Sequence, residues 1–244
     1  MEIRILQLLD GARQSMGLAV VIDVFRAFSL ACYIVDKGVH QYYVTADINI
    51  AYRLKEKHPD YLLVGERNER IPAGFDFGNS PTHIIPIVLE GKTVVHTTSA
   101  GTQGLILAAR SAQEVITGSF VNAQAIAQYI QQRKPAVISL VCMGYAAQYP
   151  TDEDTLCARY IQSLLERKAF PIEEEIQALK QTSGRRLFLP ENQLHSPASD
   201  FDYCTALNRF PFVLKATIAD KIDFPELKNN GNAEILQLEK IHIL

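Results

Sequence analysis

The chain has no tryptophan and only four cysteines, and these cysteines lie far apart in the sequence. They form no C-x-x-C pair, which argues against a zinc ribbon and against a scaffold held together by disulfides. The six histidines show no H-x-x-x-H spacing, which argues against a zinc site built on one helix. The sequence therefore gives no reason to expect a structural metal or a secreted disulfide framework.

Long apolar runs and a strong net charge are also missing. No run of about 18 apolar residues is present, as a membrane-spanning helix would need, and Met1 is not followed by the pattern of a signal peptide. We therefore expect a cytoplasmic protein with no membrane partner. The formal net charge is −3, which argues against a broad nucleic-acid-binding surface. With no linker rich in Gly, Pro or Ser, residues 1–244 are expected to form one domain.

Strand-like and helix-like segments alternate over the first two thirds of the chain. Residues 18–23, LAVVID, form a continuous apolar run that is typical of a strand covered on both faces. Residues 26–37 are apolar on several sides and are expected to form a helix. Further strands are expected at 41–45, 61–65, 93–96, 114–117, 136–143 and 212–215, and further helices at 48–57, 102–110, 122–133 and 151–168. The alternation predicts an α/β fold, with many parallel strand neighbours and helices on both faces.

The last third of the chain is less clearly patterned. Residues 171–208 are expected to be helical with polar interruptions, and residues 234–244 form a tail for which the pattern gives no firm prediction. The candidate functional residues therefore come from the first two thirds, where four polar clusters lie between the predicted elements. In open α/β sheets, ligands bind beyond the carboxyl ends of the strands.

The first cluster follows the strand at residues 18–23. Its carboxylate, Asp23, can hold a metal, act as a nucleophile or act as a base, and Arg26 can bind a phosphate or sulfonate with its forked donors. The alternative is structural: Asp23 caps the next helix and pairs with Arg26. A haloacid-dehalogenase-type phosphatase is disfavoured, because its second aspartate would stand where this chain has Phe25.

The second cluster is a long polar loop that runs from GERNER at residues 65–70 to GFDFGNSP at residues 74–81. Phe75 and Phe77 flank Asp76, and we expect these two rings to anchor the loop to the protein. The alternative is a solvated surface loop. At its end, the Ser-Pro pair predicts a helix cap followed by proline at the first helical position, and free N–H groups at a helix start can bind an anion.

The third cluster, TTSAGT at residues 97–102, lies between a predicted strand and a predicted helix. Its hydroxyl and N–H groups could hold a phosphate. It lacks the glycine pattern and lysine of a Walker A loop, and Ser and Thr are common helix caps in any case. Alone, this turn is a weak indication.

The fourth cluster combines GSFVN at residues 118–122 with the acidic triplet at residues 152–154. Carboxylates near a cleft could complete a Mg²⁺ site, because this ion prefers oxygen ligands and keeps several waters. The alternative is that the acids merely favour the first turn of a helix, where the dipole is positive.

Taken in chain order, these segments resemble the 2-phosphosulfolactate phosphatase family. The resemblance is carried by VVIDVFRAF at 20–28, GER at 65–67, GFDFGNSP at 74–81, TTSAGTQG at 97–104, GSFVNA at 118–123 and DED at 152–154. It covers about residues 18–160, with weaker similarity at 200–204. It implies a three-layer α/β/α fold with a mixed, largely parallel sheet. It also implies magnesium-dependent hydrolysis of 2-phosphosulfolactate to 3-sulfolactate and phosphate, a step of coenzyme M biosynthesis in methanogens.

The resemblance and the clusters together give a set of predicted site residues. Catalytic roles are predicted for Asp23, Arg26, Glu66 and Asp76. Substrate binding is predicted for Arg67, Asn79, Ser80, Thr97, Thr98, Ser99, Gly101 and Thr102, and Mg²⁺ binding for Asp23, Asp76 and Asp154. The sequence leaves open which carboxylate is metal ligand, base or nucleophile, and whether water attacks directly or an aspartyl phosphate forms.

Two departures from the family pattern bear on the substrate. Family members often read T-N-G-T-R in the third cluster, where this chain has Ala100 and Gln103. The partner is therefore expected to be a small acidic phosphorylated metabolite, either 2-phosphosulfolactate or a similar phosphorylated hydroxy acid. A non-catalytic anion-binding protein with the same fold is the alternative. A homodimer is the base-rate expectation.

Overall fold

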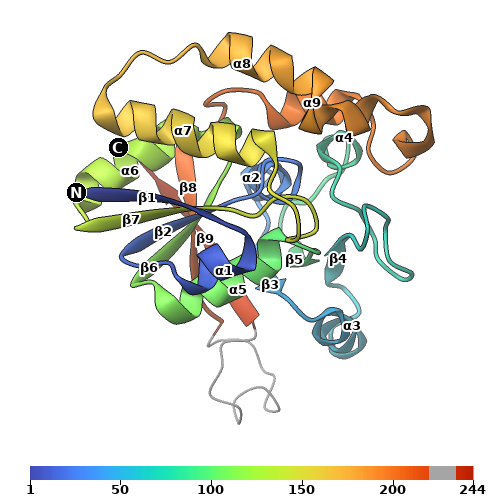
Figure 1. The fold of residues 1–244 in the computed structure, drawn as a ribbon. Helices are drawn as coiled ribbons and strands as arrows, with labels where there is room; N and C mark the ends of the chain where they lie inside the picture. The colour runs from blue at the N-terminus through green and yellow to red at the C-terminus, as the bar shows by residue number, and fades with distance from the viewer. Residues whose placement is uncertain (220–234, 244) are drawn as a thin grey trace.

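The structure is a computed structural model, and it describes residues 1–219 and 235–243. Within these residues, nine strands form one mixed sheet in the order β1-β7-β2-β6-β8-β9-β3-β5-β4, shown in Figure 1. The strands are β1 (Glu2–Gln7), β2 (Leu18–Ile22), β3 (Gln41–Thr45), β4 (Leu62–Gly65), β5 (Thr93–Thr97), β6 (Glu114–Gly118), β7 (Val137–Cys142), β8 (Phe212–Ile218) and β9 (Ile235–His242). The α-helices are α1 (Leu8–Arg13), α2 (Ala27–Asp36), α3 (Ile48–Lys57), α4 (Pro81–Ile84), α5 (Gly101–Ser111), α6 (Ala123–Arg133), α7 (Asp152–Glu166), α8 (Ile172–Ala178) and α9 (Ser199–Cys204). Four 3-10 turns, η1 (Phe120–Asn122), η2 (Leu179–Gln181), η3 (Ser183–Phe188) and η4 (Pro190–Asn192), complete the described elements.

Helices cover both faces of the sheet, which confirms the predicted three-layer α/β/α architecture. Helices α6 and α7 lie on one face, and α1 and α5 lie on the other (Figure 1). Strand β2 shows the sequence origin of this arrangement, because all five of its residues are buried. Ala19 and Val21 enter the core on the α1 and α5 side, whereas Val20 and Ile22 enter the core on the α6 and α7 side. A continuous apolar run is what a strand needs when both of its faces are covered.

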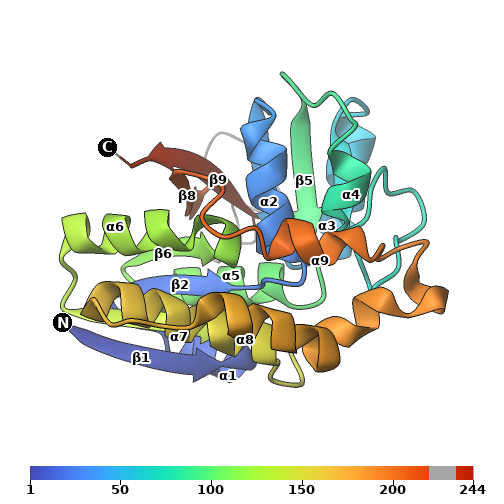
Figure 2. The ribbon, with the colours of Figure 1, turned by 90° about the horizontal axis from the view of Figure 1, so that it is seen from above.

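The sheet consists of two parallel blocks that run in opposite directions. Strands β1, β7, β2 and β6 pair in parallel, and so do β3, β5 and β4. The hairpin of β8 and β9 lies between the blocks and pairs antiparallel with both of them. In Figure 2, the twist of the sheet turns both blocks so that their carboxyl ends point toward one central region, where α2 begins. The mixed, largely parallel sheet that the family resemblance implied is thus confirmed.

Most predicted elements of the first two thirds lie within two residues of their expected bounds. In the C-terminal region, the observed elements differ from the predicted ones. Strand β8 continues three residues beyond its predicted end, and β9 forms a strand in the tail for which the pattern gave no prediction. The two ends of that tail, residues 234 and 244, lie outside the described residues. Helix α1 and strand β1, each six residues long, were also not predicted, because no element was assigned before residue 18.

Residues 169–211, called the strap from here on, pass over the region where the two blocks meet (Figure 2). The strap contains α8, η2, η3, η4 and α9. Leu187 and Phe201 anchor it in the core beneath α7. Among the helices of the described residues, none combines the length and the apolar character that a membrane crossing requires.

Candidate active site

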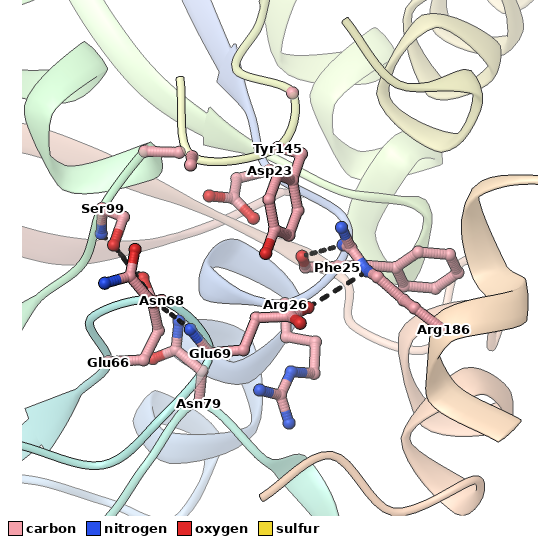
Figure 3. Close-up of a pocket in the computed structure, with 13 residues that line it drawn as sticks. Asp23, Phe25, Arg26, Glu66, Asn68, Glu69, Asn79, Ser99, Tyr145 and Arg186 are labelled. Carbon is pink, nitrogen blue, oxygen red and sulfur yellow. Dashed lines mark hydrogen bonds and ion pairs between the residues drawn. The ribbon is translucent and has the colours of Figure 1, made fainter. Parts of the chain in front are cut away.

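The carboxyl ends of the two blocks border a cleft with an empty volume of about 430 Å³, shown in Figure 3. Asp23 and Arg26 reach it from the turn after β2, and Tyr145 reaches it from the turn after β7. From the other block come Glu66, after β4, and Ser99, after β5. Four turns that are distant in sequence therefore meet in one place.

Asp23 is the most enclosed carboxylate that lines this cleft, with only 7% of the residue exposed. Its Oδ1 accepts a hydrogen bond of 3.1 Å from the Ala27 N–H, in the first turn of α2. Its Oδ2 lies against the backbone of Gly101, where a Cβ atom would stand 2.6 Å from that oxygen. Glycine at position 101 is therefore required for this close approach. Asp23 and Gly101, which were predicted separately as a catalytic and a substrate-binding residue, thus lie next to each other.

Burial raises the pKa of Asp23 to about 7, because the charged form loses its hydration. The Ala27 N–H opposes this rise, since it favours the charged form, whereas the Glu66 carboxylate adds to it. Arg186 lowers the pKa and Glu153 raises it by smaller amounts. Asp23 therefore changes protonation near neutral pH, where a functional carboxylate is most useful.

Asp154 lies behind Asp23 and joins two of the turns. Its Oδ1 accepts from the Val24 N–H at 2.8 Å, and its Oδ2 accepts from the Gly144 N–H at 2.8 Å. Burial raises the pKa of Asp154 well above its ordinary value, and the nearby carboxylates of Glu153 and Asp23 add to the rise. Both oxygens thus have backbone partners, and Asp154 does not line the cleft.

Glu66 joins two further turns at the edge of the cleft. Its carboxylate accepts hydrogen bonds from the Ser99 N–H at 2.7 Å, from the Ser99 hydroxyl at 3.1 Å and from the Glu69 N–H at 2.9 Å. These bonds hold the turn after β4 against the turn after β5. Ser99 is therefore placed as predicted beside the cleft, although its donors are directed to Glu66.

Arg26 lines the cleft, but its guanidinium is occupied by a buried carboxylate. Its Nη1 donates to Asp200 Oδ2 at 2.7 Å and to the His195 carbonyl at 2.7 Å. The same Asp200 accepts from the Ser80 hydroxyl at 2.8 Å and from the Thr82 N–H at 3.0 Å. The start of α4, expected to offer free N–H groups to a ligand, binds this protein carboxylate instead. Ser80 does cap α4, as predicted, by accepting from the His83 N–H at 3.3 Å.

The hydroxyls of the third cluster are satisfied within the protein. Thr98 and Thr102 bond to each other at the start of α5, with the Thr98 N–H donating to Thr102 Oγ1 at 2.8 Å and the Thr102 N–H donating to Thr98 Oγ1 at 3.1 Å. Thr97 Oγ1 accepts from Arg67 Nη2 at 2.8 Å. Arg67 also donates to the Glu66 carbonyl at 2.7 Å. None of these three threonine side chains nor Arg67 lines the cleft.

Asp76 lies in the loop beside the edge strand β4, outside the cleft. Its Oδ2 accepts from the Leu63 N–H at 2.8 Å and forms an ion pair of 3.2 Å with Lys55. Phe75 and Phe77 pack against separate hydrophobic cores, which confirms that they anchor the loop. The bonds of Asp76 therefore attach the loop to β4.

Asn79 lines the cleft and is oriented by a buried chain of hydrogen bonds. Its Oδ1 lies 2.9 Å from His96 Nε2, and His96 Nδ1 lies 2.7 Å from the Tyr42 hydroxyl. Burial lowers the pKa of His96 to about 3, and the nearby Arg67 lowers it further. His96 is thus a neutral core residue that holds the Asn79 side chain.

Several cleft residues were not predicted from the sequence, among them Glu69, Tyr145 and Arg186. Arg186 comes from the strap, more than 80 residues beyond the third cluster, and its segment carries no motif. Asp200, which holds Arg26, lies in the weak similarity at residues 200–204. Glu69 lies in the GERNER segment of the second cluster, which gave a sequence signal for it, whereas only proximity in space could have identified Tyr145 and Arg186.

The donor set of the cleft suits a hard cation. Three carboxylates line it, those of Asp23, Glu66 and Glu69, and Glu153 Oε2 lies buried beside them with no hydrogen-bond partner within the described part of the chain. Among the described residues, no group of three or more His, Cys, Asp or Glu side chains is arranged to hold a metal ion. Mg²⁺ does not need such a group, because it commonly uses one or two carboxylates together with waters and substrate phosphate oxygens.

Comparison with known proteins agrees with this geometry. A family described as 2-phosphosulpholactate phosphatase matches residues 4–217. The chain belongs to the 2-phosphosulfolactate phosphatase family, a family of phosphoric monoester hydrolases. A Bacillus subtilis relative named Probable 2-phosphosulfolactate phosphatase is 30% identical over 80% of this chain and 85% of its own length.

Two further relatives carry the same name. The Deinococcus radiodurans protein is 35% identical over 56% of this chain and 57% of its own length. The Caldicellulosiruptor saccharolyticus protein is 39% identical over 60% of this chain and 61% of its own length. The chain thus spans somewhat over half the length of these two members of the 2-phosphosulfolactate phosphatase family. Of the two departures noted in the third cluster, Ala100 lines the cleft and Gln103 does not.

Proposed function

We propose that this protein is a magnesium-dependent phosphatase that hydrolyses 2-phosphosulfolactate, or a closely similar phosphorylated hydroxy acid, to the free hydroxy acid and phosphate. The observation that carries the proposal is the enclosed Asp23 carboxylate, which lines a cleft where the turns after β2, β4, β5 and β7 meet; the first three of these turns belong to predicted polar clusters, and no residue of the fourth cluster lines the cleft. Membership of the phosphatase family supports the reaction type. The names of the three relatives support the substrate.

The charge of the cleft supports the requirement for a cation. Asp23, Glu66 and Glu69 contribute three negative charges when ionised, against two positive charges from Arg26 and Arg186. The positive charge of Arg26 is in addition balanced by Asp200, at 2.7 Å. A phosphate dianion entering this cleft therefore meets repulsion unless a cation accompanies it.

In this proposal, Asp23 and Glu66 supply the carboxylate oxygens for Mg²⁺. When bound, the ion neutralises the phosphoryl oxygens and lowers the pKa of a bound water. Asp23 Oδ2 makes no hydrogen bond within the described part of the chain, so this atom is available. Since the pKa of Asp23 lies at about 7, the apparent affinity for Mg²⁺ should rise as the pH rises through neutrality.

The rest of the chain orients and encloses these groups. Gly101 allows the backbone of α5 to approach Asp23. Asp154 holds the turns after β2 and β7 next to each other, because it accepts hydrogen bonds from one backbone N–H group of each turn. The Asn79 amide, fixed through His96, borders the same space. Because these contacts exist before substrate binds, little reorganisation is needed during the reaction.

The test is phosphate release from 2-phosphosulfolactate by the purified protein, with Mg²⁺ and with a chelator in excess. Wild-type protein should release phosphate only with Mg²⁺, and Asp23→Asn should be at least about 100-fold slower. The matched control is Asp152→Asn, which removes an exposed carboxylate two residues before Asp154. Normal turnover by Asp23→Asn would contradict the proposed site. Binding of the substrate without any phosphate release would indicate the non-catalytic anion-binding alternative.

The biological setting stays a prediction. The place of the reaction in coenzyme M biosynthesis rests on the family resemblance, the cytoplasmic location on the sequence, and the homodimer on the base rate. A screen of phosphorylated hydroxy acids with and without a sulfonate would identify the preferred substrate of this chain.

A further inference from the structure

We infer that Arg186 is the residue that selects substrates with a sulfonate beside the phosphate and the carboxylate, by binding that sulfonate. This inference rests on the proposed function. It assigns a specificity role to the strap, which the sequence motifs do not include.

Of the two arginines that line the cleft, Arg186 has more hydrogen-bond donors without a partner. Its only hydrogen bond within the described residues runs from Nη2 to the Phe25 carbonyl, at 2.9 Å. Its Nε is buried without a hydrogen-bond partner in the same part of the chain. A guanidinium has five N–H donors, and the two on Nη1 of Arg186 have no partner within the described residues, so they remain for a ligand. Arg26, by contrast, is held by Asp200 and the His195 carbonyl, each at 2.7 Å.

The guanidinium of Arg186 also lies where it can reach a substrate that is bound beside Asp23. Figure 3 shows it reaching from the strap to the side of the cleft where Asp23, Phe25 and Tyr145 lie. It lies over the Tyr145 ring, 5.1 Å from the centroid, and its bond to the Phe25 carbonyl ties it to the turn that carries Asp23. A phosphate beside Asp23 therefore leaves a neighbouring acidic group within the reach of Arg186.

The present partners of Arg186 are carboxylates in a poor arrangement for hydrogen bonding. Glu69 Oε1 lies 3.3 Å from its Nε, yet that Nε makes no hydrogen bond. Glu153 Oε1 lies 3.5 Å from Nη2. The Glu69 side chain is 28% exposed and sits at the tip of a tight turn, so it can move into solvent. The sulfonate of the substrate can then replace Glu69 and form the two parallel bonds that a guanidinium favours.

The test compares two substrates and three proteins. The substrates are 2-phosphosulfolactate and 2-phospholactate, which lacks the sulfonate. The proteins are wild type, Arg186→Gln and Arg185→Gln, the last being a matched control because the neighbouring Arg185 is exposed. Arg186→Gln should raise KM for 2-phosphosulfolactate by roughly 10- to 100-fold, change kcat much less, and change KM for 2-phospholactate by less than about threefold. Arg185→Gln should match wild type with both substrates.

Other outcomes separate the possible failures. An equal rise in KM for both substrates would mean that Arg186 binds the phosphate or the carboxylate, which the two substrates share, and would overturn the inference. No rise would mean that Arg186 does not touch the substrate. If Arg186→Gln is unstable, Arg186→Lys should show the same preferential loss, and Glu69→Gln should lower KM more for 2-phosphosulfolactate than for 2-phospholactate. If the wild-type protein releases no phosphate, the proposed function fails. The inference is then decided by calorimetry with 3-sulfolactate, which wild type should bind at least about tenfold more tightly than Arg186→Gln; equal binding would overturn it.

Discussion

Replacing Asp23 by asparagine should make the metal-free protein more stable at neutral and basic pH, although it removes activity. A carboxyl group whose pKa is higher in the folded than in the unfolded chain favours folding in its protonated form. Its effect on stability is therefore small below about pH 4, and stability is lost progressively as the pH rises to about 7. The ordinary pKa of 3.8 and the folded value of about 7 differ by an amount worth about 4 kcal/mol, at about 1.4 kcal/mol per pH unit.

Asparagine at position 23 keeps an oxygen for the Ala27 N–H but carries no charge. The free energy of unfolding of Asp23→Asn should therefore exceed that of wild type by up to about 4 kcal/mol at pH 8. The difference should grow by about 2 to 3 kcal/mol between pH 5 and pH 8. In a chain of this size, the full effect corresponds to a rise of roughly 8 to 16 °C in Tm.

The assay is urea unfolding at several pH values, with a chelator present and Asp152→Asn as the control. The control should stay within about 0.5 kcal/mol of wild type, because its carboxylate is exposed. Added Mg²⁺ should stabilise wild type at pH 8 and leave Asp23→Asn unchanged. A difference between Asp23→Asn and wild type that is zero or negative at pH 8, and independent of pH, would refute the reasoning about the enclosed charge.

Three further substitutions test the contacts around the cleft. Gly101→Ala should lower turnover by about tenfold or more, since a Cβ there would stand 2.6 Å from Asp23 Oδ2; unchanged kinetics would show that the close approach is unimportant. Asp200→Asn should destabilise the fold by about 3 to 5 kcal/mol, measured by urea unfolding, because it leaves the buried Arg26 cation without its counter-charge, and a loss below 1 kcal/mol would argue against that pairing. Asp76→Ala should cost about 1 kcal/mol of stability through the lost backbone bond, with a smaller effect on turnover than Asp23→Asn, and the reverse order of turnover would return Asp76 to the centre of the mechanism.

The sequence predicted those parts of the fold that depend on local pattern. The apolar run of β2 and the all-round apolar helix α2 follow from hydrophobic periodicity, and both are present. The reversal of the second block was not predictable, because it depends on the β8–β9 hairpin, whose second strand lies in a tail without a clear pattern. Only together with the twist of the sheet does this reversal bring turns from both blocks to one cleft.

Prediction of the site was limited in a related way. Motif positions identified Asp23, Glu66 and Ser99, which the structure brings to the cleft. Motif positions could not distinguish these three residues from Asp76, whose carboxylate accepts a hydrogen bond from the Leu63 N–H and so attaches the loop to the edge strand. The sequence could not predict Arg186 as a cleft residue, because its position depends on the strap crossing the cleft and not on any local spacing.

The most direct test of the account is a crystal structure with Mn²⁺ in place of Mg²⁺ and with sulfate as a phosphate mimic. Anomalous scattering should place the metal ion against Asp23 and Glu66, with the sulfate beside it in the same cleft. A metal ion bound elsewhere, such as at Asp76 beside the edge strand, with the sulfate outside the cleft, would contradict it.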